Sequence, residues 1–188
     1  MSESASFVGD ASPRRSISSL DPAGVRVPAY SAILHSLETF PRRLEECFSL
    51  FPKPMHNWQP WSWEGIPSER LTAIEQVCHV RDIERDGYHR RIRRTLAEEM
   101  PILEDIPGEP LAVERRYLDA NVEEVFADFR VARAETVALV TGLSAIQMQR
   151  VALFEGRPVA LHNLLHFLCS HDNQHLAGLH WLLGKMNG

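Results

Sequence analysis

Apolar residues recur at steps of three and four along most of the chain, a spacing that is typical of amphipathic helices. Within this pattern Pro41 predicts a kink or a restart inside the first helix, Ser68 an N-cap before the second, and Gly142 the end of the third. The four helices predicted in this way cover residues 30–51, 69–99, 122–143 and 160–186.

The segments between these helices complete the predicted fold. Residues 149–159 read QRVALFEGRPV, where two short apolar runs flank Glu-Gly, and this predicts a small β-hairpin before the last helix. Residues 1–28 lack periodic apolar positions, so we expect a flexible N-terminal tail followed by one domain over residues 29–188. Four helices with long connections predict an all-α protein, a four-helix bundle with crossovers rather than simple up-down order.

The connection between the first two helices is unusual for a small domain. Residues 52–67 contain four prolines and three tryptophans. A long loop rich in aromatic residues is more often functional or interface-forming than a mere connector. A pocket lined by the tryptophans of residues 58–63 would indicate a small-molecule substrate.

Composition narrows the classes of partner and compartment. The 188 residues carry 20 basic and 25 acidic side chains and a net charge of −5, which argues against a nucleic-acid partner. Three cysteines cannot all pair, and no apolar run is long enough for a signal peptide or a membrane span, so we expect a cytoplasmic protein without a membrane partner. One basic cluster has acidic neighbours and is interpreted as a solvated helix face: Arg90, Arg91, Arg93 and Arg94.

Histidines are concentrated in the last predicted helix. On a helical wheel His171 and His175 lie on the flank of the apolar arc, whereas three others point outward. Side chains four residues apart share one face of a helix, so His171 and His175 can bind a single ion. The outward histidines are interpreted as surface residues: His162, His166 and His180.

Two histidines make an incomplete metal site, because catalytic zinc sites use three protein ligands and one open position. The sequence of this pair also differs from the zincin HExxH motif, since Asp172 occupies the second position. Periodicity places His79 on a polar strip of the second helix with Glu75 and Asp82, where an exposed histidine is the simplest interpretation. The residues alone therefore leave the third ligand open among His35, His56, His79 and His89.

Two segments resemble the DinB-like family of proteins. IEQVCHVRDIERDGYHRRIRR is similar to the second helix of these proteins, and LLHFLCSHDNQHLAGL is similar to their last helix, with its HDxxH pattern. Arg130, Arg133 and Thr136 repeat an R-x-x-R-x-x-T-like pattern between them, so the resemblance spans roughly residues 32–183. It implies a four-helix bundle, a homodimer and a divalent metal, nickel or zinc, held by three histidines. The ligands implied by the resemblance are His79, His171 and His175.

The resemblance also implies a class of reaction. Three neutral imidazoles leave a divalent ion its full charge, which can activate water or a thiolate. Members of the wider family transfer or isomerise substrates with low-molecular-weight thiols, so the resemblance implies a metal-dependent thiol S-transferase or isomerase. Residues 52–67 depart from the usual short first loop of the family, so substrate contacts are not carried over from it.

Two other functions remain open at this stage. The ion could belong to a non-catalytic metal-binding stress-response protein and mainly stabilise the bundle. A metal-dependent hydrolase ranks last, with a general base among Glu75, Asp82 and Asp172. Neither Cys78 nor Cys169 is expected to act as a nucleophile, because both are interpreted as buried, small apolar residues.

Overall fold

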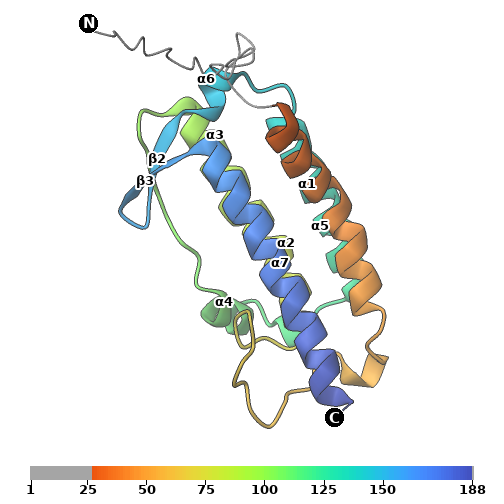
Figure 1. Ribbon diagram of the computed structural model, residues 1–188. Helices are drawn as coiled ribbons and strands as arrows, with labels where there is room; N and C mark the ends of the chain where they lie inside the picture. The colour runs from red at the N-terminus through yellow and green to blue at the C-terminus, as the bar shows by residue number, and fades with distance from the viewer. Residues whose placement is uncertain (1–26, 188) are drawn as a thin grey trace, which may run out of the picture.

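Four long helical segments form the body of the molecule in the computed structural model, which describes residues 27–187 (Figure 1). This confirms the predicted four-helix bundle. The first 26 residues of the predicted tail lie outside the described range, and residues 27 and 28 belong to the first helix. The segments are α1 (Val27–Phe48), α2 (Ala73–Asp82) continued by α3 (His89–Ala97), α5 (Val122–Val140) and α7 (Leu161–Met186).

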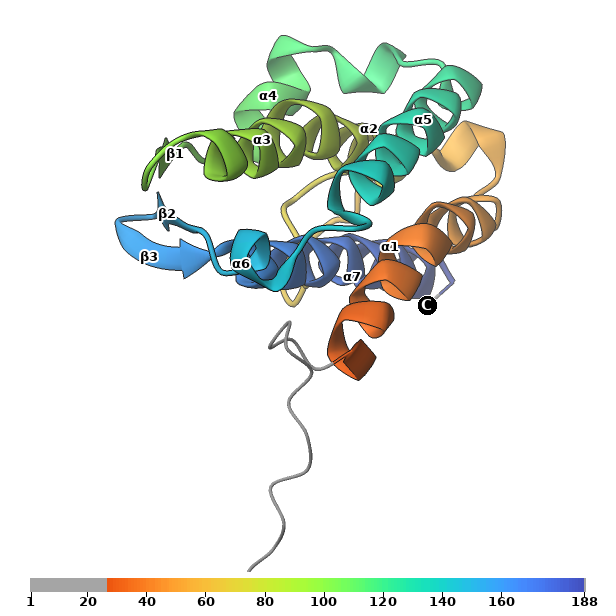
Figure 2. The ribbon, with the colours of Figure 1, turned by 90° about the horizontal axis from the view of Figure 1, so that it is seen from above.

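The four segments pack so that α2 contacts both α5 and α7, and α1 contacts the same two helices from the other side. Seen from above, α2, α3 and α5 form one layer and α1 and α7 the other (Figure 2). Residues 98–121 return the chain along the bundle to the end where α2 begins (Figure 1). This crossover contains α4 (Gly108–Glu114) and a short 3-10 helix, Tyr117–Asp119, which the sequence did not predict.

The start of α2 lies four residues after the predicted one. Thr72 is the N-cap, and the carboxylate of Glu75 accepts hydrogen bonds from the Thr72 backbone N–H at 2.8 Å and from its hydroxyl at 2.7 Å. This reciprocal cap satisfies amide groups that would otherwise be unpaired at the helix start. Ser68 is therefore not an N-cap, and Glu69 lies in an irregular segment before the helix.

The second helical segment is not α-helical throughout. Residues Ile83–Tyr88 form a π-helical turn between α2 and α3. Such turns insert one extra residue into a helix and are frequent at functional sites. This insertion rotates the residues of α3 relative to a simple helical wheel.

Pro41 does not restart the first helix, because α1 runs unbroken through it. Proline has no N–H to donate to the carbonyl four residues earlier, which here belongs to Leu37. That buried carbonyl instead accepts a hydrogen bond from Nη1 of Arg133 on α5, at 3.3 Å. A side chain from a neighbouring helix thus replaces the hydrogen bond that the proline removes.

A small sheet lies at one end of the bundle. The predicted hairpin is confirmed as β2 (Val151–Phe154) and β3 (Arg157–Ala160), antiparallel, with Glu155 and Gly156 at positive φ in the turn. A third strand, β1 (Ile102–Leu103), pairs in parallel with β2 and was not predicted. A short helix, α6 (Ala145–Met148), precedes the hairpin, and another 3-10 helix, Lys53–Met55, follows α1. Within the described range, no helix has an apolar stretch long enough to cross a membrane.

Candidate metal centre

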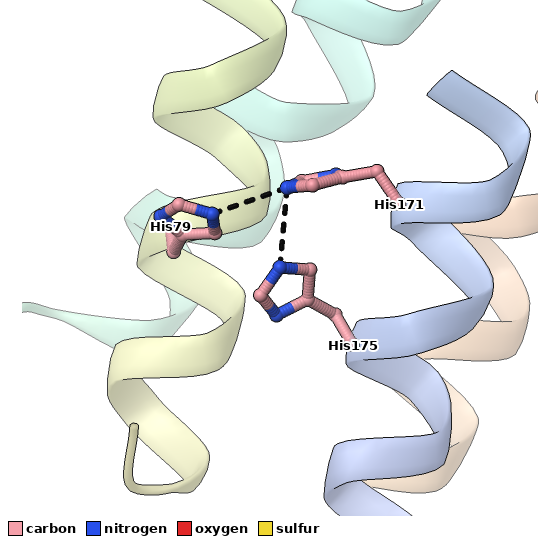
Figure 3. A group of neighbouring side chains, drawn as sticks. All are labelled: His79, His171 and His175. Atoms are coloured by element: carbon pink, nitrogen blue, oxygen red, sulfur yellow. Dashed lines mark hydrogen bonds between the residues drawn. The ribbon is translucent and has the colours of Figure 1, made fainter. Parts of the chain in front are cut away.

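Three histidines meet between α2 and α7. The Nε2 atom of His171 lies 3.1 Å from Nε2 of His79 and 3.1 Å from Nε2 of His175 (Figure 3). His79 and His175 are 1% and 0% exposed, and His171 is half-buried. The structure therefore brings together the three histidines that the resemblance implied as ligands, and it keeps His162, His166 and His180 out of this cluster.

The arrangement of these rings fits a divalent cation. Donor atoms around a tetrahedral ion with bonds of roughly 2 Å lie about 3.3 Å apart, close to the separations between these ring nitrogens. Nε2 of both His79 and His171 faces the common centre, and the Nδ1 atoms of these rings are buried without a hydrogen-bond partner among the described residues. The three histidines together could hold one metal ion.

Burial also sets the protonation state of the cluster. Loss of solvent lowers the pKa of His79, and it lowers the pKa values of His171 and His175 well below the ordinary value. The neighbouring rings lower the pKa values of His171 and His175 further, because a second positive charge so close to the first is unfavourable. All three imidazoles are therefore neutral near pH 7, which is the form that binds metals.

His79 is buried although periodicity along its own helix favoured an exposed histidine. The crossover covers it: a Cβ atom added to Gly108 of α4 would lie 2.7 Å from Cε1 of His79. Only glycine allows the backbone of α4 to approach the ring so closely. A helical wheel treats one helix alone and cannot show that a segment about 30 residues later packs over its polar strip.

A carboxylate that sequence reasoning missed lies at the edge of this cluster. Glu69 places one carboxylate oxygen 3.5 Å from Nε2 of His79 and the other 3.3 Å from Nε2 of His175. Its side chain is 39% exposed, so it lies between the buried rings and solvent. No periodic signal distinguishes Glu69, because the prediction placed it inside a helix that begins later.

The three carboxylates that were predicted as candidate bases are occupied elsewhere. Glu75 caps α2, Asp82 accepts a hydrogen bond from the Tyr117 hydroxyl at 2.8 Å, and Asp172 pairs with Arg133 at 2.8 Å. Among the described contacts, none of the three touches a site histidine. The prediction of a base among them was wrong, because each side chain points toward a cap or a buried partner rather than toward the rings.

Gln76 fixes the orientation of His175. The amide nitrogen of Gln76 donates to Ser68 Oγ at 2.8 Å and to the Leu71 carbonyl at 3.2 Å, which directs its oxygen toward the ring. That oxygen accepts a hydrogen bond from Nδ1 of His175. Since Nδ1 carries the proton, Nε2 presents its lone pair to the centre. A Cβ atom at Gly178 would lie 2.9 Å from the Gln76 nitrogen, so this glycine leaves room for the amide.

Replacing Gln76 with leucine is expected to weaken zinc binding by about 10–100-fold, the usual effect of losing a group that orients a metal-binding histidine. Zinc affinity is measured by competition with a chromogenic chelator. Gln174→Leu, on the exposed side of α7, is the matched control and should bind zinc like the wild type. Equal affinities for the two variants would show that Gln76 does not position His175.

A buried charged network lies beside the histidines. Arg133 donates to both oxygens of Glu84, each at 2.9 Å, and to both oxygens of Asp172, at 2.8 and 3.1 Å. Thr136 donates a further hydrogen bond to Glu84. Because Asp172 follows His171 in α7, the network holds this part of α7 against α5. Arg130 lies outside it and pairs with a surface glutamate.

The basic cluster of α3 is only partly a solvated face. Arg91 is 4% exposed, and its guanidinium donates to the Glu104 carbonyl at 2.8 Å, which ties the crossover to α3. The other three arginines form ion pairs nearer the surface: Arg90, Arg93 and Arg94. The prediction for Arg91 was wrong because the crossover covers it.

The cysteines are unsuited to nucleophilic chemistry. All three are free, Cys47 and Cys78 are buried, and Cys169 is half-buried. Burial raises the pKa of Cys78 to about 12 and the pKa of Cys169 to about 11, so both remain thiols near pH 7. The prediction of a buried cysteine is confirmed for Cys78 and holds in part for Cys169.

The tryptophan-rich loop packs against one end of the bundle. Trp58 and Trp63 are partly buried against the core, and Trp63 stacks on Trp181 of α7 with ring centroids 6.2 Å apart. Trp61 is fully exposed. Two of the three tryptophans thus anchor the loop that leads to Glu69.

The fold and the site together define a class: a four-helix bundle whose second and last helices carry a histidine cluster that could hold a metal. A family model of the DinB superfamily matches residues 36–179, and the chain belongs to this superfamily. The search of curated proteins found no significant match.

Among solved structures, the chain is similar to YfiT from Bacillus subtilis, described as a probable metal-dependent hydrolase with an unusual four-helix bundle topology. The two are 19% identical, with a TM-score of 0.76, and the match covers 96% of this chain and 95% of YfiT. A likeness at this identity shows a shared fold.

Proposed function

We propose that the protein binds one divalent metal ion through His79, His171 and His175 and hydrolyses a small molecule at this site. The convergence of three neutral ring nitrogens, with Nε2 distances of 3.1 Å, carries the proposal. An ion held there would supply Lewis acidity, which activates water near neutral pH. The description of YfiT as a probable metal-dependent hydrolase supports the same class of reaction.

Glu69 is the feature that favours hydrolysis over the other functions. Hydrolysis needs a group that accepts a proton from the attacking water, within hydrogen-bond reach of the reacting centre. The carboxylate of Glu69 lies 3.3 Å from a site ring and is open to solvent on its other side. Glu69 would accept that proton at one of its carboxylate oxygens, while the buried histidines exclude water from the rest of the site.

Thiol transfer or isomerisation is the second candidate. Three neutral ligands leave a nickel or zinc ion its double charge, which stabilises a thiolate. The raised pKa values of the cysteines indicate that such a thiol would come from a low-molecular-weight cofactor rather than from Cys78 or Cys169.

The test compares protein purified without an affinity tag, its metal-free form, and that form reloaded with zinc or nickel. We expect about one equivalent of ion, hydrolysis of p-nitrophenyl esters that stops on metal removal, and recovery on reloading. Ester hydrolysis that persists without metal would contradict the proposal. Metal-dependent consumption of a small thiol without hydrolysis would favour the transferase. Metal-loaded protein that shows no activity but melts at a higher temperature than the metal-free form would favour a non-catalytic role.

The proposal extends to location and assembly. Three free cysteines suit the reducing cytoplasm. The homodimer implied by the resemblance also stays a proposal, and the exposed Trp61 and Leu50, 101% and 62% accessible, are candidates for its contact surface.

A further inference from the structure

Glu69 lies where a fourth donor would complete the coordination of the ion. We propose that its carboxylate is a direct, displaceable ligand of the metal, an inference that rests on the proposed three-histidine site. Its distances to His79 and His175, 3.5 and 3.3 Å, are those expected between two donors bound to the same ion, about 3.3 Å.

The hydrogen bonds around His175 show why a cation belongs between these groups. The Leu71 carbonyl can only accept, so it fixes the amide nitrogen of Gln76, and the Gln76 oxygen then fixes the proton of His175 on Nδ1. In the neutral ring Nε2 of His175 then carries the lone pair, and it faces a carboxylate oxygen of Glu69 that also carries lone pairs. Two acceptors at 3.3 Å repel each other, whereas a cation bound to both converts the contact into an attraction.

No basic side chain of the described residues, whether lysine or arginine, explains the position of this carboxylate. Within residues 27–187, the ion-pair contacts of Glu69 are with the rings of His79 and His175, and no lysine or arginine joins them. Three ring nitrogens and a carboxylate that converge at a buried edge, with no lysine or arginine in these contacts, are a donor set that fits a divalent metal ion.

The backbone around Glu69 holds the carboxylate at the histidines. The Arg70 N–H donates to the Glu109 carboxylate at 3.2 Å, which joins this segment to α4. A Cβ atom at Gly108 would lie 3.3 Å from a carboxylate oxygen of Glu69, so the glycine of α4 leaves room for it.

The same carboxylate is the donor best able to leave. It is 39% exposed and comes from an irregular segment, whereas His79 and His175 are at most 1% exposed and belong to helices. A substrate entering from solvent would therefore take the position of Glu69 and leave the three histidines in place. The released carboxylate would remain close enough to accept a proton from the reaction.

The test measures metal binding itself, with Glu69→Gln, Glu69→Asp and the matched control Glu64→Gln. Zinc affinity is determined by chelator competition, and the coordination of cobalt(II) by its visible absorption. Aspartate keeps the charge but is one methylene shorter, so both Glu69 variants should lose affinity on the order of tenfold or more and change the cobalt spectrum. Glu64→Gln should match the wild type, because it removes the same charge from an exposed position of the preceding loop that contacts no ring.

The outcomes separate this inference from the site on which it rests. A wild-type protein that binds no zinc or cobalt overturns the metal site, and the role of Glu69 falls with it. If the wild type binds metal and both Glu69 variants keep its affinity and its cobalt spectrum, ligation by Glu69 is overturned. The three-histidine site then stands. Loss of affinity in Glu69→Gln but not in Glu69→Asp also overturns it, because a nearby charge would then suffice.

Discussion

Replacing His175 with alanine is expected to weaken metal binding strongly, so that the purified variant carries less than one equivalent of ion. Structural zinc sites with four ligands bind with roughly 10–16 kcal/mol, so one ligand accounts for roughly 3 kcal/mol, or about 100-fold in affinity. His175 is fully buried and its proton is fixed by Gln76, so alanine removes a ring nitrogen that is already oriented toward the centre. Elemental analysis of the purified variant, with zinc titration after reloading, provides the measurement.

The same helix offers a matched control. His166 is exposed on α7, and His166→Ala should retain about one equivalent of ion. Circular dichroism of both variants checks that the bundle is intact. A folded His175→Ala protein that still carries one equivalent of tightly bound metal would exclude His175 as a ligand.

Replacing Arg133 with methionine is expected to destabilise the protein by about 3–5 kcal/mol, the usual cost of removing one partner from a buried ionic network. The change leaves Glu84 and Asp172 buried without their cation, and it leaves the Leu37 carbonyl beside Pro41 without a donor. The free energy of unfolding is measured by urea denaturation of the metal-free proteins, so that metal binding does not contribute.

Arg130→Met is the control for this change. Arg130 lies three residues earlier in α5, is 50% exposed and pairs with Glu45, so its loss should change stability by less than about 1 kcal/mol. Adding Glu84→Gln and Asp172→Asn to Arg133→Met should recover part of the loss, because the uncompensated charges are then gone. Equal effects of the Arg133 and Arg130 changes would contradict the role of the network.

The parts of the fold that depend on local sequence were predictable. The α7 helix and the hairpin follow from apolar spacing and from Glu155-Gly156, and His171 and His175 could be paired because they share one face of one helix. The π-helical turn at Ile83–Tyr88 has no such local pattern and was not predicted.

The rest of the site depends on packing between distant segments. Periodicity favoured an exposed His79 because the covering glycine, Gly108, belongs to a crossover with no apolar repeat. Glu69 reaches the rings only because α2 begins at Ala73 rather than four residues earlier. Resemblance to a family suggested His79 without any knowledge of these contacts, whereas Glu69 required the three-dimensional structure.

The order in which the ribosome makes the chain gives the site a further property. His79 and His171 are separated by 92 residues, and α7 supplies two of the three rings. A nascent chain that ends before α7 holds only His79 and Glu69, too few donors to retain an ion. The first three long helical segments must therefore pack without an ion, through their apolar contacts and the ion pair of Arg133 with Glu84. Capture of the proposed metal would then be a late step of biogenesis, which follows synthesis of the last helix.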